Sequence, residues 1–172
     1  CFDVEDLRRY RQGDFASCFG AAFAGSSGRN APVYRVGAFG FFERVPELDH
    51  RGGPRRRGYA RATAAISPED WYFQSHFKDD PCMPGTLMIE ACIQLAAFYM
   101  ASMGLAEGKD GWIFEPVDAT YSFRCRGQIS PDARNVAYEL FVDEVVGGPC
   151  PTIFAHVLGT VDGRRSFGCE RL

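Results

Sequence analysis

The chain has 172 residues, of which 46% are apolar and 14% aromatic, and its formal net charge is -3. A chain of this length and apolar content can bury one full hydrophobic core, so we expect a single folded domain over 1–172 and exclude a disordered protein. The negative charge argues against a nucleic-acid-binding protein, because such proteins bind phosphates through clustered basic residues.

Seven cysteines are scattered along the sequence, an odd number with no C-x-x-C pair. Several lie in apolar runs, where buried free thiols are common, so we expect reduced cysteines and a cytoplasmic protein. The sequence opens on Cys1 and a charged stretch, and we expect residues 3–12 to form a short helix or, as part of 1–12, a linker from a larger polypeptide.

The N-terminal part alternates between turn-rich and strand-like segments. Asp14 and Gly20 are a typical helix start and stop, so 13–20 is predicted to hold a short helical turn. The other predictions are a Gly/Ser-rich loop over Gly25–Pro32, one or two strands over Val33–Val45, a polar loop over Asp49–Gly58 and a strand over Tyr59–Ile66.

A long apolar stretch, Thr86–Met103, follows Pro84-Gly85 and ends before Gly104. It is near the lower length limit for a membrane span, but Glu90 and Gln94 share one helix face and no positive flank is present. A helix that is apolar nearly all round is instead typical of a buried central helix, so we expect no membrane span.

Strand-like segments follow this helix. The predicted strands are 120–126, 135–146, 152–161 and 165–171, with Asp162-Gly163 as a hairpin turn. We therefore predict an α+β fold in which a curved antiparallel meander wraps around one long helix.

One pair of residues stands out chemically. His76 lies just before the Pro-Gly turn, and Glu90 follows it by fourteen residues inside the apolar helix. Glu90 is the only charged residue between Asp80 and Glu107, and an apolar interior penalises a carboxylate that has no function or partner.

The segment 71–100, WYFQSHFKDDPCMPGTLMIEACIQLAAFYM, resembles the bacterial 3-hydroxyacyl-[acyl-carrier-protein] dehydratases. The resemblance is strongest to the β-hydroxydecanoyl thioester dehydratases and to related domains of polyunsaturated fatty acid and polyketide synthases. Their signature places H-F before P-x-M-P-G and an acid fourteen residues after the histidine. A second match is FRCRGQISP at 123–131. The resemblance implies the hotdog fold, a sheet wrapped around one long helix.

Three positions depart from the pattern of these dehydratases. Glu90 stands where the isomerising enzymes usually carry aspartate, Cys82 replaces a small aliphatic residue, and Asp79 replaces a common glycine. These departures leave isomerase activity and chain-length preference open, while the His–Glu pair is intact.

The resemblance implies removal of water from a 3-hydroxyacyl thioester to give the trans-2-enoyl product, with no cofactor. A neutral imidazole suits His76 as the base, and apolar surroundings favour a protonated carboxyl, which suits Glu90 as the acid. Gly85, at the helix start, would offer its backbone N–H to the thioester carbonyl. Gln94, one turn past Glu90, would orient the acid or the substrate hydroxyl, or would be a core amide.

The resemblance also implies that the histidine of one subunit faces the acid of the other. We therefore expect a homodimer, or one half of a double hotdog. The substrate would arrive as a phosphopantetheine thioester on an acyl carrier protein, whose surface is acidic. The candidate carrier contacts are Arg124, Arg126 and Arg134, and the candidate tunnel residues are Trp71, Phe73, Cys82, Met83 and Phe98. The three histidines are not clustered, so no metal site is expected.

Three rival functions stay open at this point. Hotdog thioesterases also use a helix-borne carboxylate, but they lack the His-x(13)-Glu pairing. A cysteine acyltransferase could use Cys82 as nucleophile and His76 as base. A catalytically silent domain could shape a synthase or support dimerisation.

Overall fold

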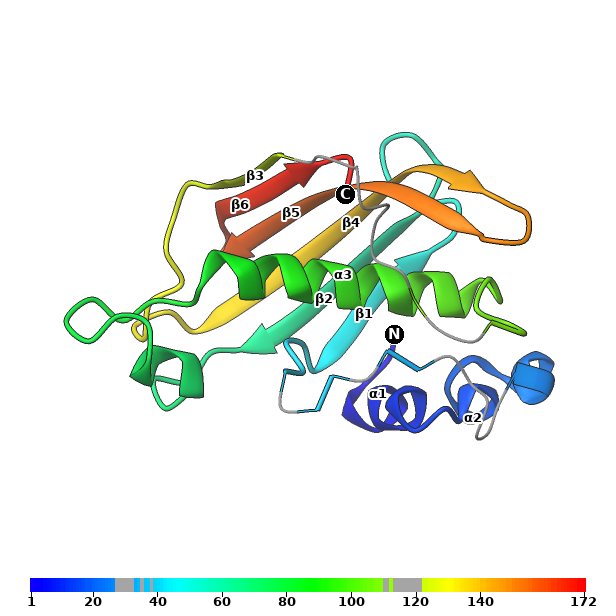
Figure 1. The fold of residues 1–172 in the computed structure, drawn as a ribbon, viewed down its shortest axis with the longest axis horizontal. Helices are drawn as coiled ribbons and strands as arrows, with labels where there is room; N and C mark the ends of the chain where they lie inside the picture. Colours follow the sequence, from blue (N-terminus) through cyan, green and yellow to red (C-terminus); the bar gives the residue numbers. More distant parts are fainter. Residues whose placement is uncertain (27–32, 35, 38, 110–111, 113–121) are drawn as a thin grey trace.

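A computed structural model of the chain describes residues 1–26, 33–34, 36–37, 39–109, 112 and 122–172. In these residues a six-stranded antiparallel sheet curves around one long helix (Figure 1). The strands are β1 (Arg44–Asp49), β2 (Tyr59–Ala65), β3 (Ser122–Cys125), β4 (Asn135–Val146), β5 (Thr152–Val161) and β6 (Arg164–Glu170). The helices are α1 (Val4–Arg11), α2 (Phe15–Phe19) and α3 (Gly85–Ser102), with 3-10 turns η1 (Ala21–Ser26) and η2 (Trp71–Gln74).

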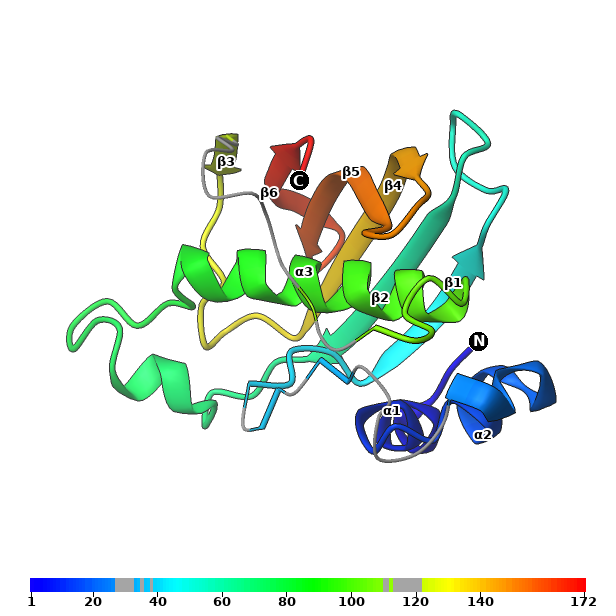
Figure 2. The ribbon, with the colours of Figure 1, turned by 45° about the vertical axis from the view of Figure 1, so that its right-hand side comes forward.

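The central helix α3 lies along the concave face of the sheet (Figure 2). By length and composition it could cross a membrane, but 61% of it is buried inside the protein. Leu95, Phe98 and Tyr99 of the helix are buried, as are Tyr138 and Leu140 of β4, so helix and sheet share one core. This arrangement confirms the predicted α+β hotdog fold.

The N-terminal residues form a helix that packs on this core. Asp3 caps α1 by accepting hydrogen bonds from the N–H groups of Glu5 and Asp6. Leu7 and Tyr10 of α1 are buried. Of the two alternatives for 3–12, the helix is therefore the one that the structure shows.

An aromatic cluster joins the N-terminal segment to the C-terminal half of α3. The rings of Phe2, Tyr10 and Phe19 surround Phe98 at centroid distances of 5.2, 4.9 and 5.2 Å. Edge-to-face pairs at such distances stabilise a core beyond simple area burial. This cluster fixes the N-terminal helices to the helix that carries Glu90.

Most sequence-predicted elements are confirmed. The observed α3 begins and ends one residue earlier than predicted, and β4 and β5 have the predicted bounds. Asp162 and Gly163 both have positive φ, 47° and 79°, as a tight Asp-Gly hairpin turn requires. The helical turn after Asp14 is α2.

The strand predicted over Val33–Val45 is wrong for most of its length. Only Arg44 and Val45 belong to a strand, β1, and the other described residues of the segment are irregular. The reason is visible in its hydrogen bonds, because the carbonyl of Phe39 and the N–H of Phe41 bind the Gln94 side chain instead of a neighbouring strand.

The order of the sheet also differs from a simple meander. The strands run β1-β2-β4-β5-β6-β3, so the first strand after α3 lies at the far edge beside β6. Only β4, β5 and β6 form the predicted meander. Parts of three predicted segments lie outside the described residues: 27–32 of the Gly/Ser-rich loop, 35 and 38 of the first predicted strand, and 120–121 of the strand predicted after the long helix.

Candidate active site

His76 lies in the loop between η2 and α3, and hydrogen bonds to Cys82 connect the two sides of this loop. The Cys82 N–H donates to the His76 carbonyl at 2.7 Å, and the His76 ring Nδ1 lies 3.0 Å from the Cys82 carbonyl oxygen. A carbonyl only accepts, so Nδ1 carries a hydrogen and, in the neutral ring, Nε2 keeps its lone pair. The loop therefore fixes the tautomer in which Nε2 can accept a proton.

Cys82 supports this histidine but is a poor nucleophile. Its sulfur lies 3.6 Å from His76 Nδ1, and only 7% of the residue is exposed. Burial raises the pKa of the Cys82 thiol, and the nearby Asp80 carboxylate raises it further. A buried, protonated thiol is inert, so the acyltransferase alternative loses its nucleophile.

Glu90 lies one and a half turns into α3, and both of its carboxyl oxygens have partners. Gln94 Nε2 donates to Oε1 at 2.9 Å, and the Tyr34 hydroxyl donates to Oε2 at 3.3 Å. Oε1 is therefore the oxygen that the buried amide of Gln94 holds, and Oε2 is the oxygen nearer Tyr34 and the pocket.

Gln94 is itself fixed by the backbone of residues 39–41. Its second Nε2 hydrogen is donated to the Phe39 carbonyl at 2.7 Å, and its Oε1 accepts from the Phe41 N–H at 3.4 Å. The residue is buried, with 3% exposed, so these bonds are shielded from water. The amide is thereby oriented as a donor toward Glu90.

The segment that holds Gln94 is held in turn by helix α1. Arg11 donates from Nη2 to the Phe42 carbonyl at 3.1 Å, and its guanidinium covers Gly40, where an added Cβ would lie 3.1 Å from that nitrogen. A continuous set of hydrogen bonds and packing contacts therefore runs from α1 through residues 39–42 to Gln94 and Glu90.

Gly85 is the first residue of α3, directly after Pro84, and the helix has no side-chain cap. The Leu87 N–H donates to the Pro84 carbonyl at 3.0 Å, whereas the N–H groups of Gly85 and Thr86 have no acceptor among the described residues. This end of α3 therefore presents donors and the positive end of the helix dipole. A Cβ at Gly85 would lie 3.3 Å from the Cys125 sulfur, so β3 leaves little room for a larger residue.

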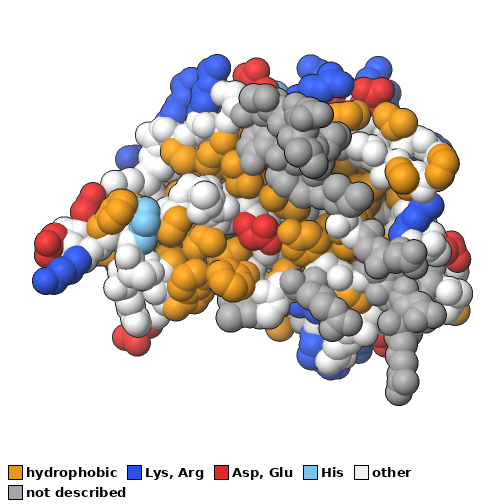
Figure 3. Space-filling view, in the orientation of Figure 1, with side chains coloured by type: hydrophobic (Ala, Val, Ile, Leu, Met, Phe, Trp, Pro, Cys, Tyr) orange, Lys and Arg blue, Asp and Glu red, His pale blue; other side chains and the backbone are white. Residues whose placement is uncertain are grey.

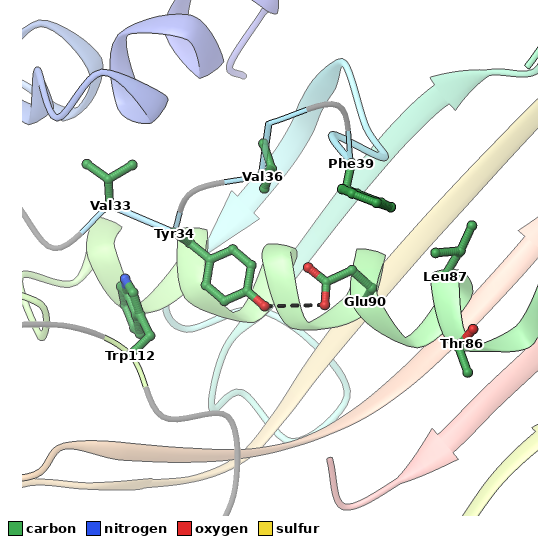
Figure 4. A pocket seen from close by; sticks show the side chains of 8 residues that line it. All are labelled: Val33, Tyr34, Val36, Phe39, Thr86, Leu87, Glu90 and Trp112. Carbon is green, nitrogen blue, oxygen red and sulfur yellow. Dashed lines mark hydrogen bonds between the residues drawn. The ribbon is translucent and has the colours of Figure 1, made fainter. Parts of the chain in front are cut away.

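An open pocket of about 610 Å³ lies beside Glu90 (Figure 4). Its walls are Thr86, Leu87 and Glu90 from α3, together with Val33, Tyr34, Val36, Phe39 and Trp112. Figure 4 shows the Tyr34 hydroxyl directed at the Glu90 carboxyl. Hydrophobic side chains gather over α3 on this face of the molecule (Figure 3), so the carboxyl lies in a largely apolar environment.

The predicted tunnel residues are not among the residues that line this pocket. Phe73, Cys82 and Met83 are buried, whereas Trp71 is 45% exposed and packs edge-on against Phe39 at 5.3 Å. Phe98 is fully buried in the aromatic cluster with the N-terminal helices, and its role in a tunnel stays a prediction. It lies about 20 Å along α3 from Gly85, at 1.5 Å per residue.

The pocket also shows what sequence reasoning missed. Thr86 and Leu87 precede Glu90 by one helical turn, so helical periodicity alone could have identified them. Tyr34 lies 56 residues away from Glu90 in sequence, and no local pattern pointed to it.

The three predicted carrier contacts are exposed and lie toward one end of the sheet. Arg124 belongs to β3 and Arg126 follows it, next to β6. Arg134 precedes β4, and its N–H donates to the Asp162 carboxylate of the β5–β6 turn.

Comparison with known proteins places this fold and site in a class. The family model described as "FabA-like domain" matches residues 35–169, which is most of the chain. The chain therefore belongs to the FabA-like domain family. With its α+β hotdog architecture, this makes it a member of the hotdog dehydratase family, as the sequence predicted.

Two solved structures are also similar. One, "The Dehydratase Heterocomplex ApeI:P from Xenorhabdus doucetiae", is 14% identical, covers 74% of this chain and 94% of its own, and has a TM-score of 0.46. The other is an uncharacterized protein from Erwinia carotovora subsp. atroseptica, 14% identical, covering 67% of this chain and 83% of its own, with a TM-score of 0.45. The family assignment rests on the sequence match.

Proposed function

We propose that this protein removes water from a 3-hydroxyacyl thioester to give the trans-2-enoyl thioester. The observation that carries the proposal is the hydrogen bonding of the His76 ring and of the Glu90 carboxyl in a chain of the FabA-like family. His76 has a fixed Nδ1 hydrogen and an Nε2 that accepts no bond from the described residues, and Glu90 lines an open pocket with Oε1 held by Gln94 and Oε2 beside the Tyr34 hydroxyl. One group is arranged to accept a proton and the other to donate one.

The reaction needs both groups. His76 Nε2 takes a proton from the α-carbon, and the electron pair of that C–H bond forms the new double bond as the C–O bond at the 3-position breaks. Glu90 Oε2 gives its proton to the departing hydroxyl, which leaves as water. A proton lost from the imidazolium and one regained by the carboxylate restore the starting state, and no cofactor takes part.

The negative charge that develops on the thioester oxygen requires a donor. The first-turn N–H groups of α3, starting at Gly85, and the positive end of the helix dipole suit this role. Gln94 acts through Glu90, because it holds Oε1 and so leaves Oε2, on the Tyr34 side, as the oxygen that meets the substrate.

Two chains would complete one site. Within one chain the described residues that line the Glu90 pocket do not include His76. The exposed aromatic residues Phe39, Trp71 and Phe77 belong to the pocket wall, to η2 and to the His76 loop. We propose a homodimer, or a pairing with a second hotdog, in which the Glu90 of one subunit faces the partner subunit's His76.

The proposed substrate carrier is an acyl carrier protein with a phosphopantetheine thioester, in the cytoplasm. Arg124, Arg126 and Arg134 are exposed cations that an acidic carrier could contact. These contacts would mainly raise the association rate and would weaken as salt increases.

Mass spectrometry of a 3-hydroxyacyl carrier-protein thioester tests the proposal. The wild type should remove one water, and His76→Ala and Glu90→Gln should each lower the rate by about 10²–10⁴-fold, since each removes one general catalyst. Circular dichroism should show that both variants keep the fold. Near-wild-type turnover by either variant would remove its residue from the chemistry.

The same experiment separates the alternatives. Release of the free acid by the wild type would identify a thioesterase. An unchanged thioester across several acyl lengths would indicate a catalytically silent domain and would contradict the proposal.

A further inference from the structure

We propose that Tyr34 is a positioning residue of the active site, which holds Glu90 Oε2 toward the pocket through the hydrogen bond from its hydroxyl. This inference rests on the proposed dehydration, because it assigns a task within that reaction. It concerns a position outside the residues 35–169 that match the family model, so membership of the family does not assign it.

The contact joins two distant parts of the chain at the acid itself. The Tyr34 hydroxyl lies 3.3 Å from Glu90 Oε2, and both side chains line the same pocket (Figure 4). The other oxygen, Oε1, is already held by Gln94. Each carboxyl oxygen of Glu90 therefore accepts one hydrogen bond, from the Gln94 amide on α3 and from the Tyr34 phenol, which lines the same pocket.

Tyr34 is chemically suited to remain a donor. Its side chain is half-buried, and burial, reinforced by the neighbouring Glu90, raises the pKa of Tyr34 to about 12. The phenol stays protonated at any pH where the protein works, so it donates to Oε2 whenever that oxygen is ionised. A carboxylate with two fixed donors keeps one orientation, and the oxygen that must receive the next proton stays on the pocket side.

The structure offers a matched control for this pair. Tyr59 on β2 also donates to a glutamate, Glu139 on β4, at 2.7 Å, but this pair lies on the sheet and outside the Glu90 pocket. Tyr59→Phe removes the same chemical group from the same kind of contact. Any general effect of deleting a tyrosine hydroxyl should appear in both variants.

The kinetic test compares Tyr34→Phe with Tyr59→Phe over a range of pH on a 3-hydroxyacyl carrier-protein thioester. Tyr34→Phe should lower kcat/KM by about 10-fold, the value of one lost hydrogen bond, whereas Tyr59→Phe should match the wild type.

A second measurement reports the pair without turnover. Tyrosine labelled with ¹³C at Cζ gives one resonance per tyrosine, and the spectrum of Tyr34→Phe assigns the Tyr34 signal. Because Glu90 raises the pKa of Tyr34, the signal should titrate at lower pH in Glu90→Gln, while the Tyr59 signal should not move.

The outcomes separate this inference from the proposed function. If the wild type is active but Tyr34→Phe and Tyr59→Phe have equal kcat/KM, the role of Tyr34 is overturned and dehydration stands. The same follows if the Tyr34 signal titrates at the same pH in the wild type and in Glu90→Gln. A wild type that never removes water overturns both. Reduced kcat/KM in Tyr34→Phe and a Tyr34 titration that changes in Glu90→Gln together support the assignment.

Discussion

Gln94 is the residue on which the geometry of the acid depends. It is buried, and it uses both Nε2 hydrogens and its oxygen, so every polar atom of the amide has a partner. A buried amide with all of its bonds formed is rigid, and removing it leaves the backbone groups of Phe39 and Phe41 without their partner. The cost of its loss therefore falls on both stability and orientation.

Gln94→Met, which keeps the size and removes the hydrogen bonds, should lower kcat by about 10-fold and the free energy of unfolding by about 1–3 kcal/mol. The matched control is Ser102→Ala on the same helix, because Ser102 is also buried and its hydroxyl bonds the Tyr99 carbonyl and His50. That variant should lose stability in urea denaturation and keep its kcat. Equal kcat for Gln94→Met and wild type would contradict the role of the amide.

At the scale of elements, helix α1 stabilises the segment that carries the Gln94 partners. Arg11 contacts both Gly40 and the Phe42 carbonyl, whereas the neighbouring Arg8 faces solvent and pairs only locally, with Glu5 and Gln12. Two arginines three residues apart on one helix thus have very different surroundings.

Arg11→Met should lower the free energy of unfolding by about 1.5–3 kcal/mol, since a charge-assisted bond to a buried carbonyl is lost. It should also reduce kcat, because residues 39–42 then hold Gln94 less firmly. Arg8→Met should change stability by less than about 1 kcal/mol, as for other exposed ion pairs, and leave kcat unchanged. Thermal or urea unfolding of the two variants, with kcat on the same preparations, decides the point; equal effects would contradict the coupling.

Elements with a strong local period could be predicted from the sequence. The apolar run gave α3 to within one residue, and alternating side chains gave the bounds of β4 and β5. The strand prediction before Arg44 failed because the aromatic and β-branched composition there resembles a strand, although the Phe39 carbonyl and the Phe41 N–H bind the Gln94 side chain of α3.

The candidate site divides in the same way. His76, Glu90 and Gln94 share a motif or a helical spacing, so the sequence could place them. Tyr34 and Arg11 act across 56 and 31 residues of chain, on Glu90 and Phe42, and only the folded structure brings such residues together.

For the whole molecule, mixing two inactive variants tests whether one active site takes residues from two subunits. His76→Ala and Glu90→Gln should each be inactive alone. If one site takes its histidine and its glutamate from different subunits, a mixed dimer contains one intact site. An equimolar mixture with exchanged subunits should then recover about a quarter of wild-type activity, because half of the dimers are mixed and each has one of two sites.

The control is the double variant, His76→Ala with Glu90→Gln in one chain, mixed with wild type, in which the mixed dimer has no intact site. No recovery in the first mixture, with subunit exchange confirmed by native mass spectrometry, would show that one chain supplies both residues.

The order of the elements along the chain has a consequence during synthesis. The apolar helix α3 ends at Ser102, but the strands that complete the sheet around it, β3 to β6, end only at Glu170. At ribosomal rates this interval of 68 residues takes about 3–14 s. At the start of that interval the nascent chain carries a helix as apolar as a membrane span, and four of the six described strands are still to be made. We therefore expect chaperones that bind exposed apolar helices to bind α3 while the chain is still attached to the ribosome.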